Sequence, residues 1–212
     1  NNKKLSVGDK VMIKDISGRI LNNEPVGITG NDKYKNLLKV TEERWNGQIK
    51  YTDNSNNEYE SGVQIITGKD DKIVFKRTLK LVPQELAVGI GCKKGKSAHE
   101  IERAVKKTFD KAGLLLEAIA VVASVDRKAD EAGIIEFARK CKVPYKTYTP
   151  EYLRDVEGDF VSSAFVEEQI GVGNVCERSA GAASSGGEKL VGKTADNGVT
   201  VAIYRVAQKN KE

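Results

Sequence analysis

The chain has 212 residues, and 35 lysines and arginines against 30 aspartates and glutamates leave a formal net charge of +5. With 39% hydrophobic and 31% charged residues, it needs neither disulfides nor a metal to hold a core, and disordered or collagen-like chains are excluded. The longest apolar stretch, residues 112–125, contains Glu117 and is shorter than the roughly 18 residues of a membrane span. We therefore expect no membrane as partner, and because lysine and glutamate alternate along most segments we expect no nucleic acid either.

The first residues and the cysteines indicate what kind of protein and which cellular location to expect. The first residue is Asn rather than Met, and residues 1–8 lack the pattern of a signal peptide, so we expect a piece of a longer protein. Cys92, Cys141 and Cys176 are scattered and form no CxxC pair, which argues against a disulfide framework and a zinc site. A cytoplasmic location and no metal bound by the protein itself are the expectations.

The first 85 residues predict a small α/β segment. Asp9 is positioned to cap a helix that ends near Leu21. Strands are expected at residues 26–29, 63–67 and 73–82, the last two around a turn at 68–71, with a polar loop at 52–61. We assign residues 1–23 to a linker or to the end of a preceding domain, and residues 24–85 to a small α/β middle domain.

From residue 86 onward, strand-like runs alternate with amphipathic stretches of helical length, which is typical of βαβ units. Strands are predicted at residues 86–90, 119–125 and 144–149, helices at 97–112, 130–140, 164–170 and 174–183 with a short one opening at Pro150, and a terminal hairpin at 189–194 and 199–206. The fold class is therefore α/β: residues 86–207 form a three-layer domain with a mixed, mostly parallel sheet of about five strands, and residues 208–212 form a tail.

The loop after the first of these strands has the composition of an anion site. Gly89, Gly91 and Gly95 lie between a buried strand and a helix that Ser97 and Glu100 begin with a capping box. Such glycines let backbone N–H groups approach an anion, and three lysines, Lys93, Lys94 and Lys96, add charge. The loop misses both the dinucleotide fingerprint and the Walker A motif by one residue. A nucleotide ligand and a purely structural turn therefore both remain open.

Four acidic residues are candidate acids or bases, and each also has a structural interpretation. Asp126 and Asp130 are placed to cap the second helix, and Glu131 lies in its first turn, where the helix dipole favours a carboxylate. Glu177 stands three residues after Asn174, with which it would complete a capping box. Asp126 also lies where a ribose-binding acid would.

Other polar residues are weaker candidates. His99 is the only histidine, which excludes a catalytic triad and a histidine-rich metal site within one chain. Cys92, beside lysines at a helix start, has the setting of a lowered thiol pKa, although a small residue filling the strand end is the simpler interpretation. Ser162 precedes a short helix and would cap it. Lys193 and Thr200 are expected to face each other across the hairpin, toward a ligand or solvent.

Four motifs, in order, carry a family resemblance over residues 86–206: GIGCKKG, VDRKADEAGIIEFA, SS-x-x-VEEQIGVGNVCERSA and LVGKTADNGVTVAIYR. Together they resemble the C-terminal domain of CbiG, the cobalt-precorrin 5A hydrolases of anaerobic cobalamin biosynthesis. The family's further N-terminal domain is absent from this sequence.

The resemblance implies an enzyme that opens the δ-lactone of cobalt-precorrin 5A and releases acetaldehyde to give cobalt-precorrin 5B. Cobalt would arrive within the substrate, so no cofactor is expected. The partners are a cobalt corrinoid and other enzymes of the pathway, and homo-oligomerisation stays open. The predicted catalytic residues are Glu131, Lys128 and Glu177. The predicted substrate-binding residues are Gly89, Gly91, Cys92, Lys94, Gly95, Lys96, Ser97, Asp126, Ser162, Lys193 and Thr200. A non-catalytic tetrapyrrole-binding module and a nucleotide-binding enzyme are the alternatives, and this piece alone need not be active.

Overall fold

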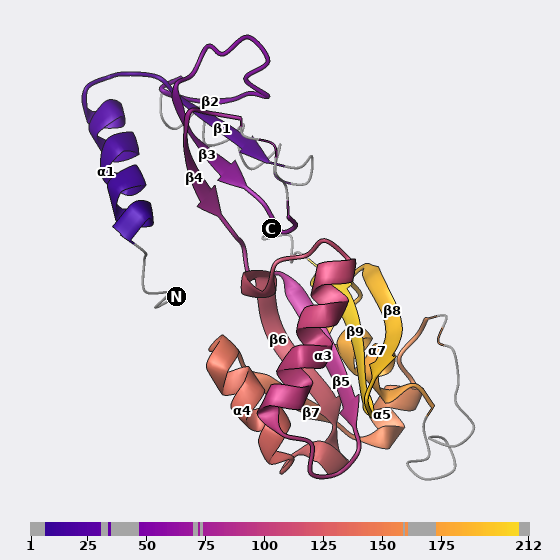
Figure 1. The fold of residues 1–212 in the computed structure, drawn as a ribbon. Coiled ribbons are helices and arrows are strands. Elements are labelled where there is room, and N and C mark those ends of the chain that lie inside the picture. The colour runs from indigo at the N-terminus through magenta and orange to yellow at the C-terminus, as the bar shows by residue number, and fades with distance from the viewer. Residues whose placement is uncertain are drawn as a thin grey trace. The chain divides into compact units, whose positions relative to one another are not determined.

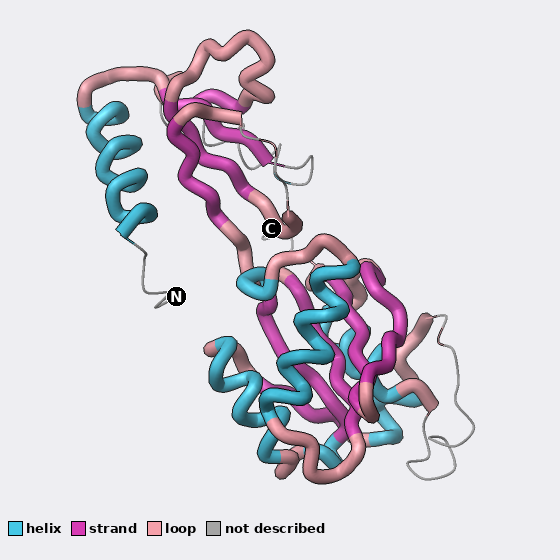
Figure 2. The backbone as a smooth tube through the Cα atoms, in the orientation of Figure 1, coloured by secondary structure: helices cyan, strands magenta, loops and turns pink. Residues whose placement is uncertain are grey.

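The structure is a computed structural model, and it describes residues 7–30, 34, 47–69, 72, 74–158, 160 and 173–207. The chain divides into two compact units, Asn1–Pro83 and Gln84–Glu212 (Figure 1). Both units combine helices with strands, as the tube in Figure 2 shows. The α/β class predicted from the sequence is confirmed.

The first unit is built on a parallel sheet with strand order β2-β1-β3-β4. Its elements are α1 (Val7–Leu21), β1 (Val26–Gly30), β2 (Ile49–Tyr51), β3 (Ser61–Ile65) and β4 (Arg77–Leu81). Ile16 of α1 packs against Val26 and Leu79, so the helix covers one face of the sheet.

Two predictions about the first unit are wrong in detail. Helix α1 begins at Val7, so Asp9 lies inside the helix and not at its cap. Strands β3 and β4 pair in parallel, so the predicted turn at 68–71 cannot join them as a hairpin. The segment between them instead carries Phe75, which is 1% exposed and packs against the backbone of Gly27 and Gly62. A Cβ atom at either glycine would overlap the phenyl ring.

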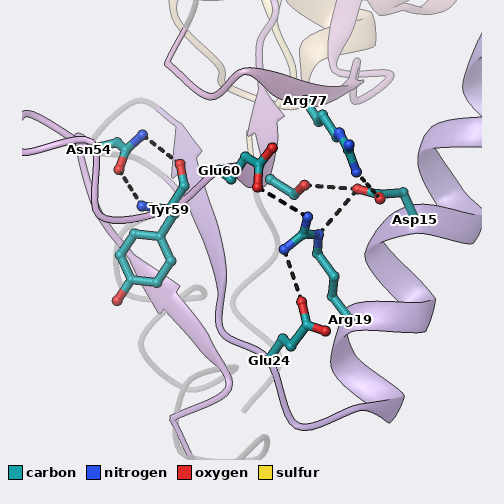
Figure 3. Close-up of polar contacts among 8 residues, drawn as sticks. Asp15, Arg19, Glu24, Asn54, Tyr59, Glu60 and Arg77 are labelled. Carbon is teal, nitrogen blue, oxygen red and sulfur yellow. Dashed lines mark hydrogen bonds and ion pairs between the residues drawn. The ribbon is translucent and has the colours of Figure 1, made fainter.

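Polar side chains tie α1 to the amino ends of β3 and β4 (Figure 3). Asp15 accepts a hydrogen bond from Ser61 Oγ at 2.8 Å and one from Arg77 Nη1 at 2.7 Å. Arg19 adds ion pairs with Asp15, Glu24 and Glu60 at 3.0–3.5 Å. These contacts hold the amino edge of the sheet together. Ligands of parallel α/β sheets bind at the opposite, carboxyl edge.

The polar loop predicted at residues 52–61 is organised by Asn54, which is 6% exposed. Its side chain accepts a hydrogen bond from Tyr59 N at 2.9 Å and donates one to Tyr59 O at 3.0 Å (Figure 3). It also donates to Val74 O at 2.7 Å. The side chain of one asparagine therefore provides hydrogen-bond partners for backbone groups that have none from a helix or a sheet.

The second unit is built on a mixed five-stranded sheet in the order β7-β6-β5-β9-β8. Strands β5, β6 and β7 are parallel, whereas β9 is antiparallel to both β5 and β8. The strands are β5 (Leu86–Cys92), β6 (Ile119–Val125), β7 (Tyr145–Tyr148), β8 (Lys189–Asp196) and β9 (Val199–Arg205). The helical elements are α3 (Ala98–Lys111), η1 (Leu116–Ala118), η2 (Asp126–Lys128), α4 (Ala132–Cys141), α5 (Pro150–Arg154) and α7 (Val175–Ser184).

Helices lie on both faces of this sheet, with α3 in front and α7 behind in Figure 1. On the α7 side, Cys176 and Ala180 pack against Ala87, Ala123 and Ala202. These side chains are small, and α7 lies so close to β5 that a Cβ atom on Gly89 would overlap the carbonyl oxygen of Cys176. Gly89 therefore serves the packing of helix on strand.

Most predicted boundaries in this unit agree with the structure. Strand β6 matches the predicted residues 119–125, and Ser97 and Glu100 form the expected capping box of α3. The predicted helix at 164–170 lies outside the described residues. Helix α4 begins at Ala132 after Glu131, which makes no side-chain cap bond, so the capping roles assigned to Asp126 and Asp130 are wrong.

Candidate functional site

The carboxyl edge of the five-stranded sheet brings two predicted motifs together. The segment between β5 and α3, residues 93–97, is called the lysine loop below, and the segment between β6 and α4, residues 126–131, is called the DRKADE loop. Lys93, Lys94 and Gly95 are exposed. Gly133, in the first turn of α4, lies directly against the backbone of Lys96, so the two loops are in contact.

Glu131 connects the two loops. One oxygen of its carboxylate accepts a hydrogen bond from Gly95 N at 2.8 Å, and the other accepts one from Lys128 Nζ at 2.8 Å. The side chains of Lys128 and Glu131 are 16% and 9% exposed. Burial opposes ionisation of Glu131, but the hydrogen bonds from Lys128 and Gly95 and the charges of Lys128 and Lys94 outweigh it and lower its pKa.

The cations of this edge fall into two kinds. Lys128 is paired with Glu131, and Lys96 is paired with Glu100 at 2.7 Å. The bonds from Lys96 and Ser97 lower the pKa of Glu100 to about 2, so that carboxylate stays ionised. Lys93 and Lys94 are exposed and form no close ion pair within the described part of the chain, although the charge of Lys94 acts on Glu131. They are the cations free to meet an anionic ligand.

Backbone amides of the lysine loop bind acceptors of the chain itself. Lys93 N donates to Gly198 O at 2.9 Å, Gly95 N donates to Glu131, and Ser97 N donates to Glu100 at 3.0 Å. An open phosphate cradle would leave such amides pointing at a ligand. The loop therefore offers side-chain charge, and this arrangement gives no support to a nucleotide site.

Tyr145 of β7, which was not among the predicted site residues, holds the backbone of the DRKADE loop by a hydrogen bond. Its hydroxyl donates to the carbonyl oxygen of Lys128 at 2.8 Å, and the Ser124 hydroxyl beside it donates to Ile90 O at 2.7 Å. Burial raises the pKa of Tyr145 to about 12, so the phenol remains a hydrogen-bond donor. The signal in the sequence was a tyrosine among polar residues on an edge strand, which is too common to single out.

Cys92 lies close to the same groups but is not an activated thiol. Burial raises its pKa, and the opposing charges of Lys128 and Lys96 do not overcome that effect. The alternative of a lowered Cys92 pKa is therefore wrong, and the simpler interpretation of a small residue at the strand end agrees with the structure.

Glu177 lies elsewhere, on the first turn of α7, and is 2% exposed. Asn174 caps the helix by accepting a hydrogen bond from Glu177 N at 3.4 Å. The Glu177 carboxylate does not return to that cap. It accepts a hydrogen bond from Lys193 N, where the pairing register of β8 and β9 shifts, and lies 3.9 Å from Lys189 Nζ. Glu177 therefore fastens α7 to an irregular part of β8.

Three predicted site residues remain: Thr200 in β9, Asp126 in η2, and Ser162. Thr200 donates to Gly91 O at 3.3 Å and pairs with Ala195, so the expectation that it faces Lys193 across the hairpin is wrong. Asp126 begins η2, and one of its carboxylate oxygens is buried with no hydrogen-bond partner among the residues that the structure describes. Ser162 lies outside the described residues.

A protein-family model described as "Cobalamin synthesis G C-terminus" matches residues 86–204, more than half of the chain. The chain belongs to this family. The matched residues run from the start of β5 to the last residues of β9, so they contain both loops and α7. The family resemblance predicted from the four motifs is confirmed.

Two curated proteins are similar to the same chain over more than half of its length. The chain is 36% identical over 125 residues to the cobalt-precorrin-5A hydrolase of Salmonella typhimurium, a match covering 58% of this chain and 35% of that protein. It is 30% identical over 145 residues to the probable cobalt-precorrin-5A hydrolase of Methanocaldococcus jannaschii, covering 62% and 44%. The chain thus spans less than half the length of these relatives.

A solved structure of CobE, a protein from the cobalamin (vitamin B12) biosynthetic pathway, is similar to the same part of the chain. The two share 29% identity with a TM-score of 0.55, over 60% of this chain and 94% of CobE. A domain of this kind therefore accounts for nearly all of that solved chain.

The described residues contain no group of three or more His, Cys, Asp or Glu side chains that could hold a metal ion. No helix within the described ranges has both the length and the apolar character to cross a membrane.

Proposed function

We propose that the second unit binds the cobalt-bearing, carboxylate-rimmed macrocycle of cobalt-precorrin 5A. It would take part in the hydrolytic opening of the δ-lactone, which releases acetaldehyde and leaves cobalt-precorrin 5B. Membership of the cobalamin synthesis G family and the names of the two hydrolases support the choice of substrate. The observation that carries the proposal is the pair of exposed lysines, Lys93 and Lys94, at the carboxyl edge of the sheet, which form no close ion pair with any residue that the structure describes. That edge is where open α/β sheets bind ligands.

The chemistry requires a base for water and a cation for the lactone carbonyl. Glu131 and Lys128 are the predicted pair for these roles, and they stand at the same edge. In the structure each is the other's partner, at 2.8 Å. We therefore place Lys93 and Lys94 in substrate binding, and expect Glu131 and Lys128 to act only after they separate.

The test is an assay of acetaldehyde release from cobalt-precorrin 5A, comparing the chain with its Lys93→Ala/Lys94→Ala variant. Loss of two contacts to substrate carboxylates should lower kcat/KM about a hundredfold or more, chiefly through KM, because each charge-assisted bond contributes about 1.5–3 kcal/mol. A Lys106→Ala/Lys146→Ala variant, which removes two exposed lysines from α3 and β7, is the matched control. Equal losses in both double variants would reject the assignment.

A binding module without chemistry of its own is the second candidate. It is favoured by the pairing of Glu131 with Lys128, and by the chain spanning only 35% and 44% of the two hydrolases. Under this alternative the chain binds a corrinoid carboxylic acid but releases no acetaldehyde, while Lys93→Ala/Lys94→Ala still weakens binding. Calorimetric titration together with the acetaldehyde assay separates the two candidates.

A further inference from the structure

The Glu131 carboxylate is held as a bound anion would be. Its two oxygens take one donor each, Gly95 N and Lys128 Nζ, both at 2.8 Å, and the two donors come from different loops. Lys94 adds a further charge that acts on the carboxylate. One backbone N–H, one ammonium group and a nearby second cation form a complete site for a carboxylate.

The bond between Gly95 and Glu131 lies on the exposed surface, and Lys93 and Lys94 beside it are exposed as well. A carboxylate reaching this edge from solvent would therefore meet Gly95 N before any buried group. The sequence also predicted an anion at this loop, and the structure has a carboxylate of the chain itself there.

Helix α4 does not depend on the Glu131 side chain. Glu131 is the N-cap residue of α4, with an extended backbone at φ −74° and ψ 99°, but its side chain makes no cap bond to the helix. Moving the carboxylate away would leave the backbone bonds from Ile134 N and Ile135 N to Glu131 O in place. If the carboxylate of a ligand took the place of the Glu131 carboxylate, Gly95 N and Lys128 Nζ would both still have a hydrogen-bond acceptor.

We propose that Gly95 N and Lys128 Nζ form a carboxylate subsite which Glu131 occupies in the absence of ligand and which a carboxylate arm of the substrate takes over by displacing it. The identity of the ligand rests on the proposed function, whereas the subsite itself does not. Displacement frees Glu131 from the groups that lower its pKa, so the same event that seats the substrate makes Glu131 a stronger base.

The subsite is tested first with acetate as the probe. In the full chain carrying Glu131→Ala, the Gly95 amide resonance should shift on titration with sodium acetate and saturate on the order of tens of millimolar. Sodium chloride at equal ionic strength should give no saturating shift. The control is Glu136→Ala, which removes an exposed carboxylate from α4 whose nearest ion-pair partner is Lys140 at 3.7 Å. If Gly95 in Glu131→Ala responds alike to acetate and chloride, there is no carboxylate subsite.

Self-occupation is tested with cobyrinic acid, a corrinoid with free carboxylates, by isothermal titration calorimetry. Glu131→Gln removes the competing charge but keeps an oxygen that can accept from Gly95. If Glu131 fills the subsite about nine-tenths of the time, its removal should tighten binding about tenfold. Glu136→Gln should stay within about twofold of the unmodified chain.

Weaker or unchanged binding by Glu131→Gln would overturn self-occupation. It would mean that the bonds of Glu131 to Gly95 and Lys128 support the structure of the loops and do not compete with the ligand. If acetate binds Glu131→Ala while no form of the chain binds cobyrinic acid, the subsite stands and the proposed corrinoid function fails. The two ideas can therefore fail separately.

Discussion

At the scale of single residues, Glu100 shows how one carboxylate serves two neighbours. It accepts from Ser97 N at 3.0 Å within the capping box and from Lys96 Nζ at 2.7 Å. The capping box satisfies the first N–H groups of α3, and the ion pair fixes Lys96 at the end of the lysine loop. Glu100 thereby sets where the helix begins and which lysine is not available to a ligand.

The lowered pKa of Glu100 predicts a pH dependence of stability. Because the folded state holds the pKa at about 2, against an ordinary value of 4.5, the ionised form stabilises the fold above pH 4.5. That contribution is lost as the pH falls from 4.5 toward about 2. The difference in urea midpoint between the unmodified chain and Glu100→Gln should therefore be constant above pH 5 and shrink below pH 4.5. Glu102→Gln, on the same helix but outside the cap, controls for the change in net charge. A difference that stays constant down to pH 2.5 would contradict the capping role.

Local patterns predict what residues do to their chain neighbours, and here they were right for two helix starts and wrong for the caps predicted at Asp9, Asp126 and Asp130. The capping box at Ser97 and the Asn174 cap of α7 are both present, because such motifs involve residues three apart. The bond from Gly95 to Glu131 joins residues 36 apart, and no pattern in one sequence fixes such a partner. Topology predicted that Lys128 lies at the same sheet edge as the lysine loop, whereas Glu131 was chosen from its motif and its attachment to Gly95 was not predicted.

At the scale of elements, the packing of α7 on β5 depends on the absence of a side chain at Gly89. Replacing Gly89 by Ala places a methyl group against the backbone oxygen of Cys176, which cannot move without shifting the helix. We expect Gly89→Ala to destabilise the second unit by about 3 kcal/mol, the upper part of the range for overpacked cores.

The control substitution lies on α7, the helix that packs against Gly89. A Cβ atom added to Gly181 of α7 would make only ordinary van der Waals contacts, the nearest with Val156 at 3.4 Å, so the methyl group of alanine fits there. Gly181→Ala should be neutral or stabilising by up to about 1 kcal/mol, because alanine favours a helix more than glycine does. Urea denaturation followed by circular dichroism measures both variants. Equal stability of Gly89→Ala and the unmodified chain would show that α7 can move away from β5.

Sequence patterns identified most elements of the second unit and fewer of the first. The runs at residues 86–90 and 119–125 are nearly uniform in apolar character, which marks strands buried on both faces. The strands of the first unit are short, and the partners of β3 are parallel strands distant in sequence. The register shifts within β8 could not be predicted either, because the acceptor of Lys193 N there is the Glu177 carboxylate of α7 and not the neighbouring strand.

At the scale of the whole molecule, the match to CobE suggests how far the second unit is autonomous. The similarity covers 94% of CobE, so a domain of this kind makes up nearly all of that chain. We expect residues 84–212, expressed alone, to fold with the same sheet. Their amide resonances should overlay those of the corresponding residues in the full chain, apart from the first few. Collapsed, poorly dispersed spectra would show that the second unit needs the first.

Strand β9 follows every other strand along the chain, yet it lies between β5 and β8 in the sheet. Before its residues emerge from the ribosome, β5 has an unpaired side and β8 has no neighbour. The nascent domain therefore holds an open strand edge until Arg205 has been made, and such edges invite association with other chains. Synthesis interrupted anywhere before Val199 would leave a product prone to aggregate, even though both loops of the candidate site had already been translated.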